Sequence, residues 1–160
     1  MFRWTRDAES WGKAITKNNE IFKLQFDLYY AYLLIGLIDG KQRKIDKDAV
    51  DVIGNFPEAY KEKSKLIINM LLAVELKARG IDLTSKKHVK ALIEKLIEES
   101  GNSLRAGGDG GFYACNLYAN YGFEIMNENL TKPTGNIRAF MNAYIGLLKN
   151  KLGGKNIFSN

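Results

Sequence analysis

The spacing of apolar positions predicts helices along most of the chain. The first helix is expected over residues 5–17, where the apolar positions recur at intervals of four, three and four: Trp4, Ala8, Trp11 and Ile15. These side chains share one helical face, and Thr5 is a suitable N-cap. We expect the two tryptophans to dock this helix onto the core. A stacking platform for nucleic-acid bases is the alternative interpretation.

Residues 20–45 carry two conflicting patterns. At the start, apolar and polar residues alternate from Phe22 to Leu28, which is a strand signal, and Asp39-Gly40 is typical of a hairpin turn. However, the apolar run continues for about twenty residues, which is longer than a typical strand. We expect a long buried helix over 20–39, ended by Gly40 in a left-handed conformation. A hairpin within 20–45 stays open as the alternative.

The rest of the chain also has a helical pattern. A short helix is expected over 46–54, and a long one starts at Pro57 and ends at Gly80. The part from Leu66 to Leu76 is apolar almost all round, which is typical of a central core helix. Later helices are expected from Thr84 to about Ser100, from Phe112 to Met126, and from Pro133 to Gly153, with a loop at 127–132.

These elements predict an all-α fold. We expect a single-domain bundle of about six or seven helices over residues 1–154, arranged around the long helices at 20–39 and 57–79. Residues 155–160 are expected to be a frayed tail. A chain of 160 residues with 46% hydrophobic and 26% charged residues is ordinary for one globular domain.

Charge and cysteine content narrow the classes of function. The net charge of +6 favours polyanionic partners such as nucleic acid. One cysteine excludes a disulfide framework and fits a reducing compartment. The N-terminal sequence has no apolar segment typical of a secretory signal, and the longest apolar run, Leu28–Ile38, is too short to cross a bilayer. We expect a cytoplasmic protein without a membrane partner.

No catalytic or metal-binding motif stands out. Cys115 is expected to be a small core residue and His88, the single histidine, an exposed or capping group. Glu75 precedes Arg79 by four residues, the favourable order for a helical ion pair. A P-loop and a dinucleotide-binding fingerprint are both absent from the sequence. The sequence therefore predicts a non-enzymatic protein with no cofactor and no metal.

Glycines cluster just before the helix expected from Phe112. Gly107, Gly108, Gly110 and Gly111 precede this helix, and such glycines let backbone N–H groups converge on an anion. Arg105 can add a bidentate phosphate contact, whereas Asp109 opposes anion binding. The alternative is a flexible connection whose glycines satisfy turns with positive φ.

Within the helix that follows the glycines, polar residues recur every four positions. They form one polar stripe, and we treat it as a candidate binding surface together with the loop: Asn116, Asn120 and Glu124.

Two groups of basic residues are candidate nucleic-acid contacts. Lys86, Lys87 and Lys90 lie in the first turns of a helix, where the helix dipole disfavours cations, so we expect them to be kept for a partner. The second group lies in a connector with Lys47: Lys41, Arg43 and Lys44. The leading hypothesis is a non-enzymatic nucleic-acid-binding protein or nucleoprotein subunit that contacts the phosphate backbone through a basic face.

A short segment adds a resemblance. Thr134-Gly-Asn-Ile-Arg-Ala-Phe140 resembles a helix start in the small all-α subunit of type III CRISPR effector complexes. It covers seven residues and lies near the C-terminus here, whereas it comes early in that family, and we transfer no functional residue. It keeps nucleoprotein assembly among the hypotheses.

The second hypothesis is a protein-interaction module or inhibitor, as a homo-oligomer or with a protein partner. Its motive is the surplus of aromatic residues around Trp4, Trp11 and residues 112–121, since aromatic residues are enriched at interfaces.

Overall fold

The chain folds into helices with one small sheet. The computed structural model describes residues 1–16, 22–130 and 137–153, and this part of the chain is mainly helical, consistent with the predicted all-α class. The helices are α1 (Arg6–Thr16), α2 (Gln25–Asp39), α3 (Lys61–Ala78), α4 (Lys86–Leu96), α5 (Gly111–Asn129) and α6 (Ile137–Gly153). The strands are β1 (Phe2–Trp4) and β2 (Val50–Ile53), and a 3₁₀ turn, η1 (Glu58–Tyr60), precedes α3.

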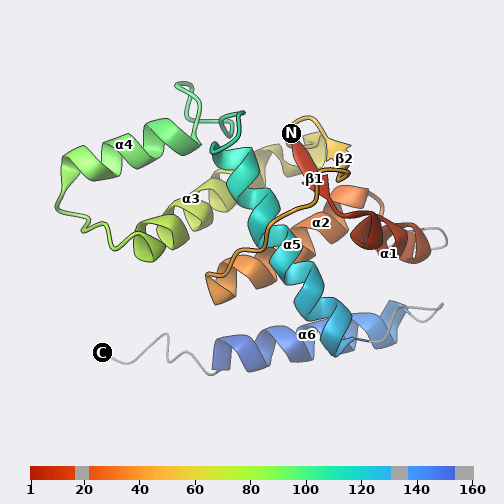
Figure 1. Cartoon of the computed structure of the whole chain (residues 1–160). Coiled ribbons are helices and arrows are strands. Elements are labelled where there is room, and N and C mark those ends of the chain that lie inside the picture. Colours follow the sequence, from red (N-terminus) through yellow and green to blue (C-terminus); the bar gives the residue numbers. More distant parts are fainter. Residues whose placement is uncertain (17–21, 131–136, 154–160) are drawn as a thin grey trace.

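Helices α2 and α5 cross at the centre of the molecule (Figure 1). Their backbones touch where each helix has an interior glycine: a Cβ at Gly36 would lie 2.0 Å from the Tyr118 carbonyl oxygen, and one at Gly122 would lie 1.8 Å from the Tyr32 carbonyl oxygen. Both glycines are therefore required by the close approach of the helices. Since α2 and α5 form the core, the predicted central role of 57–79 is wrong.

The ambiguous segment is a helix. Within the described residues, α2 begins at Gln25, after Phe22 and Leu24, and the Asp27 carboxylate accepts the Leu24 backbone N–H at 2.9 Å to close its first turn. Gly40 ends α2 with φ 64°, as predicted, and the hairpin alternative is wrong. Nine α2 residues are buried, so the helix is covered on nearly all sides and its apolar run needed no strand partner.

The sheet contradicts one prediction. Residues 46–54 contain strand β2 rather than a short helix, and β2 pairs antiparallel with β1 with Trp4 opposite Val50. The Arg3 guanidinium and the Asp51 carboxylate, 2.9 Å apart, close the pair on its exposed side. Three- and four-residue strands carry too few alternations to be separated from helix by period.

Helix α1 packs onto the core as predicted. Trp4, Ala8, Trp11 and Ile15 are all buried, and the Thr5 hydroxyl caps the helix by accepting the Ala8 backbone N–H at 3.3 Å. The Trp11 ring meets Phe123 of α5 edge-on, with ring centroids 5.9 Å apart. Because both tryptophans are buried, the stacking-platform alternative is wrong.

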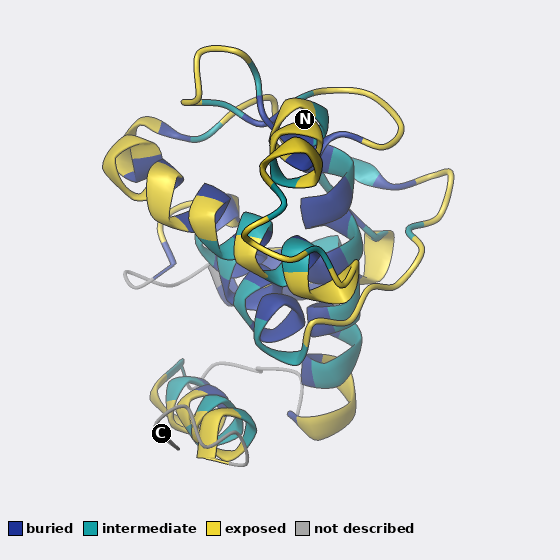
Figure 2. Ribbon diagram, turned by 90° about the vertical axis from the view of Figure 1, so that its left-hand side faces the viewer, coloured by how far each residue is buried: buried dark blue, intermediate teal, exposed yellow. Residues whose placement is uncertain are grey.

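Helices α3 and α4 form a hairpin at one side of the molecule (Figure 1). Helix α3 starts at Lys61 rather than Pro57, because η1 intervenes, and Gly80 follows it with φ 61°, as predicted. Helix α4 starts after Ser85 rather than Thr84 and ends at Leu96. Figure 2 looks at the molecule from this side, and much of the hairpin is exposed.

Helix α6 packs against α2. Phe140 and Tyr144 are its buried residues within 137–153, and the Tyr144 hydroxyl donates to the Ala31 carbonyl oxygen at 3.1 Å. Near its C-terminal end, Lys151 Nζ lies 2.5 Å from the Asp39 carboxylate. Helix α5 continues to Asn129, into the predicted loop. The predicted helix start at Pro133 and the predicted tail at 155–160 lie outside the described residues.

No helix in the described ranges has the length and apolar character needed to cross a membrane.

Candidate functional site

The α3–α4 hairpin carries an excess of basic charge. Residues 61–96 contain nine Lys or Arg and four Asp or Glu residues, which gives this segment a net charge of +5, and residues 131–160 carry the same net charge. The tip of this hairpin, residues 77–90, has a single acid, Asp82, against five cations: Lys77, Arg79, Lys86, Lys87 and Lys90. An electropositive protrusion of this kind attracts polyanions.

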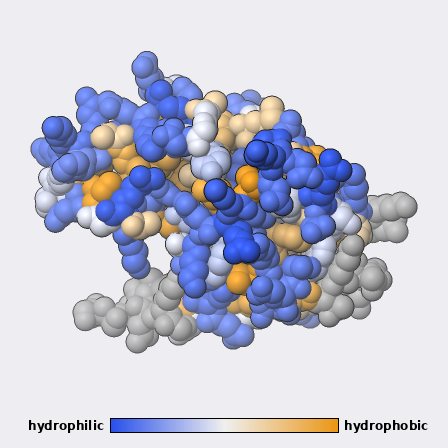
Figure 3. Space-filling view, in the orientation of Figure 1, coloured by the Kyte–Doolittle hydropathy of each residue, from blue (hydrophilic) through white to orange (hydrophobic). Residues whose placement is uncertain are grey.

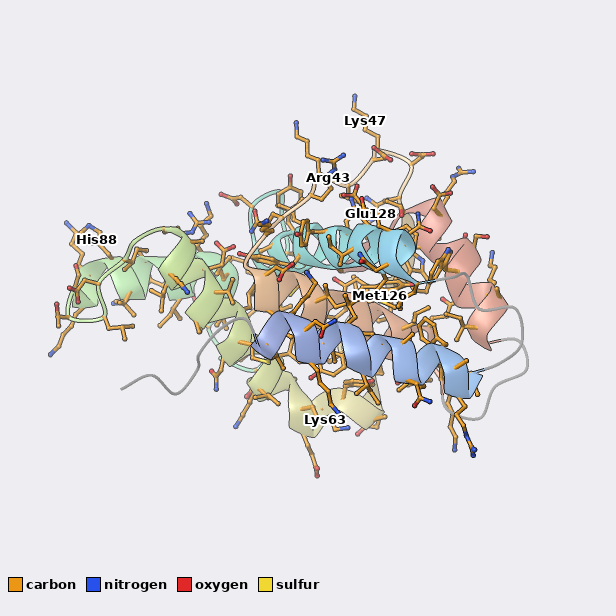
Figure 4. All side chains as sticks on the ribbon, turned by 90° about the horizontal axis from the view of Figure 1, so that it is seen from below. Arg43, Lys47, Lys63, His88, Met126 and Glu128 are labelled. Atoms are coloured by element: carbon orange, nitrogen blue, oxygen red, sulfur yellow. The ribbon has the colours of Figure 1, made fainter. Side chains whose placement is uncertain are left out.

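The predicted lysines of α4 are exposed at this tip. Lys86 and Lys87 have no ion-pair partner among the described residues, and Lys90 lies 3.6 Å from Glu94 one turn further along. His88 lies beside them at the far end of the hairpin (Figure 4), and its Nδ1 is 2.7 Å from the Ser85 hydroxyl. The prediction that His88 is an exposed or capping group is therefore confirmed.

The predicted polar stripe of α5 holds other segments in place. Asn120 donates its side-chain N–H to the Lys44 carbonyl oxygen at 2.7 Å, and Glu124 pairs with Arg43 at 3.0 Å. The Arg43 backbone N–H also donates to the Leu117 carbonyl oxygen at 3.0 Å. These contacts fix the connector across α5, and they use the Arg43 guanidinium that was expected to face a phosphate.

Asn116 anchors the N-terminal strand in the same way. Its side-chain oxygen accepts the Arg3 backbone N–H at 2.9 Å and the Tyr29 hydroxyl at 2.7 Å, and its side-chain amide donates to the Met1 carbonyl oxygen at 3.2 Å. Asn116 and Asn120 are buried. The polar stripe thus carries contacts that hold the fold together.

The candidate basic groups do not share one place. Arg105 lies at the C-terminal end of α4, where its backbone N–H donates to the Leu96 carbonyl oxygen at 2.8 Å. With a helical rise of 1.5 Å per residue, Lys86 lies roughly 15 Å away along the helix axis. Arg43 and Lys47 of the connector project from the middle of the molecule (Figure 4), away from the hairpin tip.

The glycine-rich loop is packed rather than open at its helical end. A Cβ at Gly110 would lie 2.4 Å from the Arg105 carbonyl oxygen, and one at Gly111 would lie 2.1 Å from the Leu96 carbonyl oxygen. The Phe112 backbone N–H donates to the Arg105 carbonyl oxygen at 3.3 Å, so it already has an acceptor. Gly107 has φ 111°, a conformation that favours glycine, and Gly108 has open space around it.

Asp109 in this loop has a cationic partner. Lys95 Nζ lies 2.8 Å from the Asp109 carboxylate, and the hydrogen bond and charge of Lys95 lower the pKa of this carboxyl. The pair joins the loop to α4. The charged group beside the glycines is therefore a carboxylate paired with a lysine, and not an unpaired cation.

Glu75 is a buried charge whose carboxylate accepts several hydrogen bonds. Its carboxylate is buried and accepts hydrogen bonds from Arg79 at 2.7 and 2.9 Å, from the Gln42 amide at 2.7 Å and from the Tyr118 hydroxyl at 2.8 Å. Burial, and then the bond to Glu75, raise the pKa of Tyr118. A pocket of about 260 Å³ borders these groups and Gly40. The predicted pair of Glu75 with Arg79 is confirmed.

The single cysteine lacks the features of a reactive nucleophile, and the described residues form no metal cluster. Cys115 is fully buried, as predicted, and burial, with a smaller contribution from the Glu75 charge, strongly raises the pKa of its thiol. The reactive thiolate is therefore disfavoured. In the described ranges, no group of three or more His, Cys, Asp or Glu side chains is placed to hold a metal ion.

The hairpin also carries an apolar groove that the sequence pattern did not predict. The groove has a volume of about 380 Å³ and is lined by residues of α3 and the following loop: Asn69, Leu72, Ala73, Leu76, Lys77, Ile81 and Leu83. Leu83 is 74% exposed, and Leu66, earlier on α3, is 56% exposed. Figure 3 shows hydrophobic surface among hydrophilic surface on the side of the molecule where this hairpin lies.

Comparison with known proteins does not add a function. No protein-family model matches the chain, and no curated protein sequence or solved structure matches it either.

Two signals in the sequence point to the hairpin. A charge count by segment finds an excess of basic residues over 61–96, and an equal excess over 131–160. The all-round apolar pattern of Leu66–Leu76 was interpreted as burial, but the same pattern fits a helix with one face left uncovered. In contrast, Gln42 and Tyr118 reach Glu75 from distant parts of the chain, and no local spacing indicates that cluster.

Proposed function

We propose that this chain is a non-enzymatic nucleic-acid-binding protein or nucleoprotein subunit that contacts phosphate backbone through the α3–α4 hairpin. The observation that carries the proposal is the net charge of +5 over residues 61–96, with Lys86 and Lys87 exposed and unpaired among the described residues. A cytoplasmic location and a single helical domain over residues 1–154 go with this proposal.

The hairpin is a better candidate than the connector or the glycine loop. In the connector, Arg43 pairs with Glu124, and Lys41 Nζ lies over the Tyr121 ring, 5.9 Å from its centroid. At the glycine loop, Asp109 pairs with Lys95. Cations that lack an acidic partner release more counterions from nucleic acid when they bind, which favours Lys86 and Lys87 over the paired Arg43 and Lys95.

The test is binding of labelled duplex DNA and single-stranded RNA, measured by fluorescence anisotropy. The salt concentration is varied from roughly 50 to roughly 300 mM, because affinity falls with the logarithm of salt. Replacing Lys86, Lys87 and Lys90 by Gln is expected to weaken binding and to reduce the salt slope by about one unit per lost phosphate contact. The matched control replaces three exposed lysines elsewhere, one of them on α1: Lys13, Lys23 and Lys149.

The control lowers the net charge by the same amount as the hairpin variant. If binding uses the hairpin, the control retains most of the affinity and the salt slope. Equal weakening by both variants would place the interaction on the general charge of the protein, and absence of binding at low salt would refute the proposal.

A protein-interaction role, with a protein partner or as a homo-oligomer, is the second candidate function. Most of the aromatic residues that motivated it, including Trp4, Trp11, Phe112 and Tyr118, are buried, whereas Tyr113 and Tyr121 are half-buried. The exposed groove on the hairpin is the observation that favours it instead.

A further inference from the structure

Helix α3 is more apolar than its position requires. A helix that is apolar all round normally lies inside a protein. Within α3, however, the buried face consists of Ser64, Ile67, Ile68, Leu71 and Glu75, and the helix lies at the side of the α2–α5 core (Figure 1). On its other side Leu66 is exposed, and Leu72 and Leu76 are half-buried, so part of their apolar surface faces outward in the described structure.

Half-buried and exposed residues line the groove. Asn69, Leu72, Ala73 and Leu76 lie at intervals of three, one and three residues, so they follow one side of α3, and Ile81 and Leu83 of the next loop also line the groove. A groove of this form suits an amphipathic helix, whose anchors also repeat every three or four residues.

The charge around the groove selects the occupant. Lys77 lines the groove, Lys65 lies one turn before Asn69 on the same side of α3, and both are exposed without an ion-pair partner among the described residues. Of the two acids near the groove in sequence, Glu75 is buried and bound by Arg79, and Asp82 accepts the backbone N–H and the hydroxyl of Thr84, at 2.8 and 2.7 Å. A second copy would bring another hairpin of net charge +5 against this one, which electrostatic repulsion opposes.

We propose that the groove formed by α3 and residues 81–83 binds an amphipathic helix of a protein partner, with leucine-like anchors on one face and acidic residues beside them. This inference deepens the second candidate function, the protein-interaction role, and rests on it. The apolar anchors supply the burial, and Lys65 and Lys77 supply the preference for acidic flanks.

The test uses three synthetic peptides rather than an unknown partner. The first is a helical peptide with leucines at i, i+3, i+4 and i+7 and glutamates flanking them; the second has lysines in place of the glutamates; the third has serines in place of the leucines. Binding is followed by anisotropy and by amide chemical shifts of the labelled full chain. The glutamate peptide is expected to bind about tenfold more tightly than either of the others, with shifts at Leu72, Leu76 and Leu83.

Leu83→Ser is the decisive variant, because Leu83 is 74% exposed and its loss leaves the core intact. It is expected to weaken the glutamate peptide about tenfold, as loss of an interface anchor does. The matched control is Ile145→Ser on α6, which removes another exposed apolar side chain, 43% exposed, outside the groove. The control is expected to bind the peptide as the unchanged protein does.

Several outcomes overturn the inference. Equal binding of the glutamate and lysine peptides contradicts the charge preference, and equal effects of Leu83→Ser and Ile145→Ser contradict the site. A dimer that Leu83→Ser converts into a monomer puts a second copy in the groove instead. Leu83→Ser is also expected to leave nucleic-acid affinity unchanged, and an equal loss there makes the groove part of the nucleic-acid surface. If the unchanged protein binds the glutamate peptide but binds no nucleic acid, the leading function is wrong and the groove proposal stands.

Discussion

At the residue scale, two glycines decide how closely the central helices approach. Gly36 and Gly122 each lie against a carbonyl oxygen of the facing helix, at distances that leave no space for a side chain. They are single glycines inside helical patterns, where glycine normally costs about 1 kcal/mol relative to alanine. The close packing of α2 on α5 compensates for that cost.

Gly122→Ala is expected to destabilise the protein by about 3 kcal/mol or more, since overpacking of this size forces the helices apart. The new Cβ would lie 1.8 Å from the Tyr32 carbonyl oxygen. Urea unfolding followed by circular dichroism measures the change. Gly146→Ala is the matched control, because Gly146 lies within α6 with open space around it; there alanine is expected to stabilise by roughly 0.5–1 kcal/mol. If the two variants have similar stability, the close contact is wrong.

The glycines that cluster in the sequence are not the ones that bring the central helices together. The cluster lies at 107–111, whereas the two isolated glycines of α2 and α5 lie at the crossing of these helices. An isolated glycine within a helix can indicate packing, but which helix it faces depends on the crossing, and that information is not local. Glycines at helix ends were easier to predict. Gly40 and Gly80 were correctly predicted, because a helix end with positive φ is a local property.

At the scale of elements, Glu75 joins three parts of the chain. Its carboxylate binds the connector through Gln42, α5 through Tyr118 and the end of its own helix through Arg79. This cluster attaches the hairpin to the core beside the apolar contacts of Ile67, Ile68 and Leu71. The groove and the α4 lysines depend on it for their position.

Arg79→Ala is expected to destabilise the protein by roughly 1–3 kcal/mol, because the Glu75 charge stays buried with two neutral donors. Hydrogen exchange is expected to accelerate in α3 and α4 more than in α2. Glu58→Gln serves as the control: it removes the exposed pair with Lys61 and should change stability by less than about 0.5 kcal/mol. Uniform acceleration across the chain would contradict a local attachment.

Elements were predicted better than their arrangement. Helical periodicity identified the six helices of the described ranges to within a few residues, and α2 and α3 start later than expected. The two short strands were missed. The central helix was also predicted wrongly. Helix α3 was expected at the centre, because hydrophobicity alone does not distinguish a buried helix from one that keeps an exposed apolar surface.

At the scale of the whole molecule, buried tyrosines make stability depend on alkaline pH. Burial raises the pKa of Tyr29 and Tyr32 well above the ordinary value of 10.0, and the pKa values of Tyr118 and Tyr144 are raised mainly for the same reason. Above pH 10 the unfolded chain loses these protons while the folded protein keeps them. Stability is thus complete below that pH and is lost as pH rises through it.

The free energy of unfolding is expected to be constant from pH 8 to 9.5 and to fall above pH 10, by about 1.4 kcal/mol per pH unit for each such tyrosine. Urea titrations at several pH values measure it. The tyrosinate absorbance that comes from these buried tyrosines should rise only as the protein unfolds. Ionisation of these tyrosines near pH 10 in a chain that stays folded would contradict their burial.

The crossing of α2 and α5 also has a consequence for synthesis on the ribosome. Helix α2 ends at Asp39 and its main partner begins at Gly111, so the nascent chain contains a completed apolar helix long before its cover is made. The connector that lies across α5 is also made first and gains its anchors, Asn120 and Glu124, only when α5 arrives. The core therefore closes late in translation, and until then the α2 surface must be shielded by transient contacts or by a chaperone.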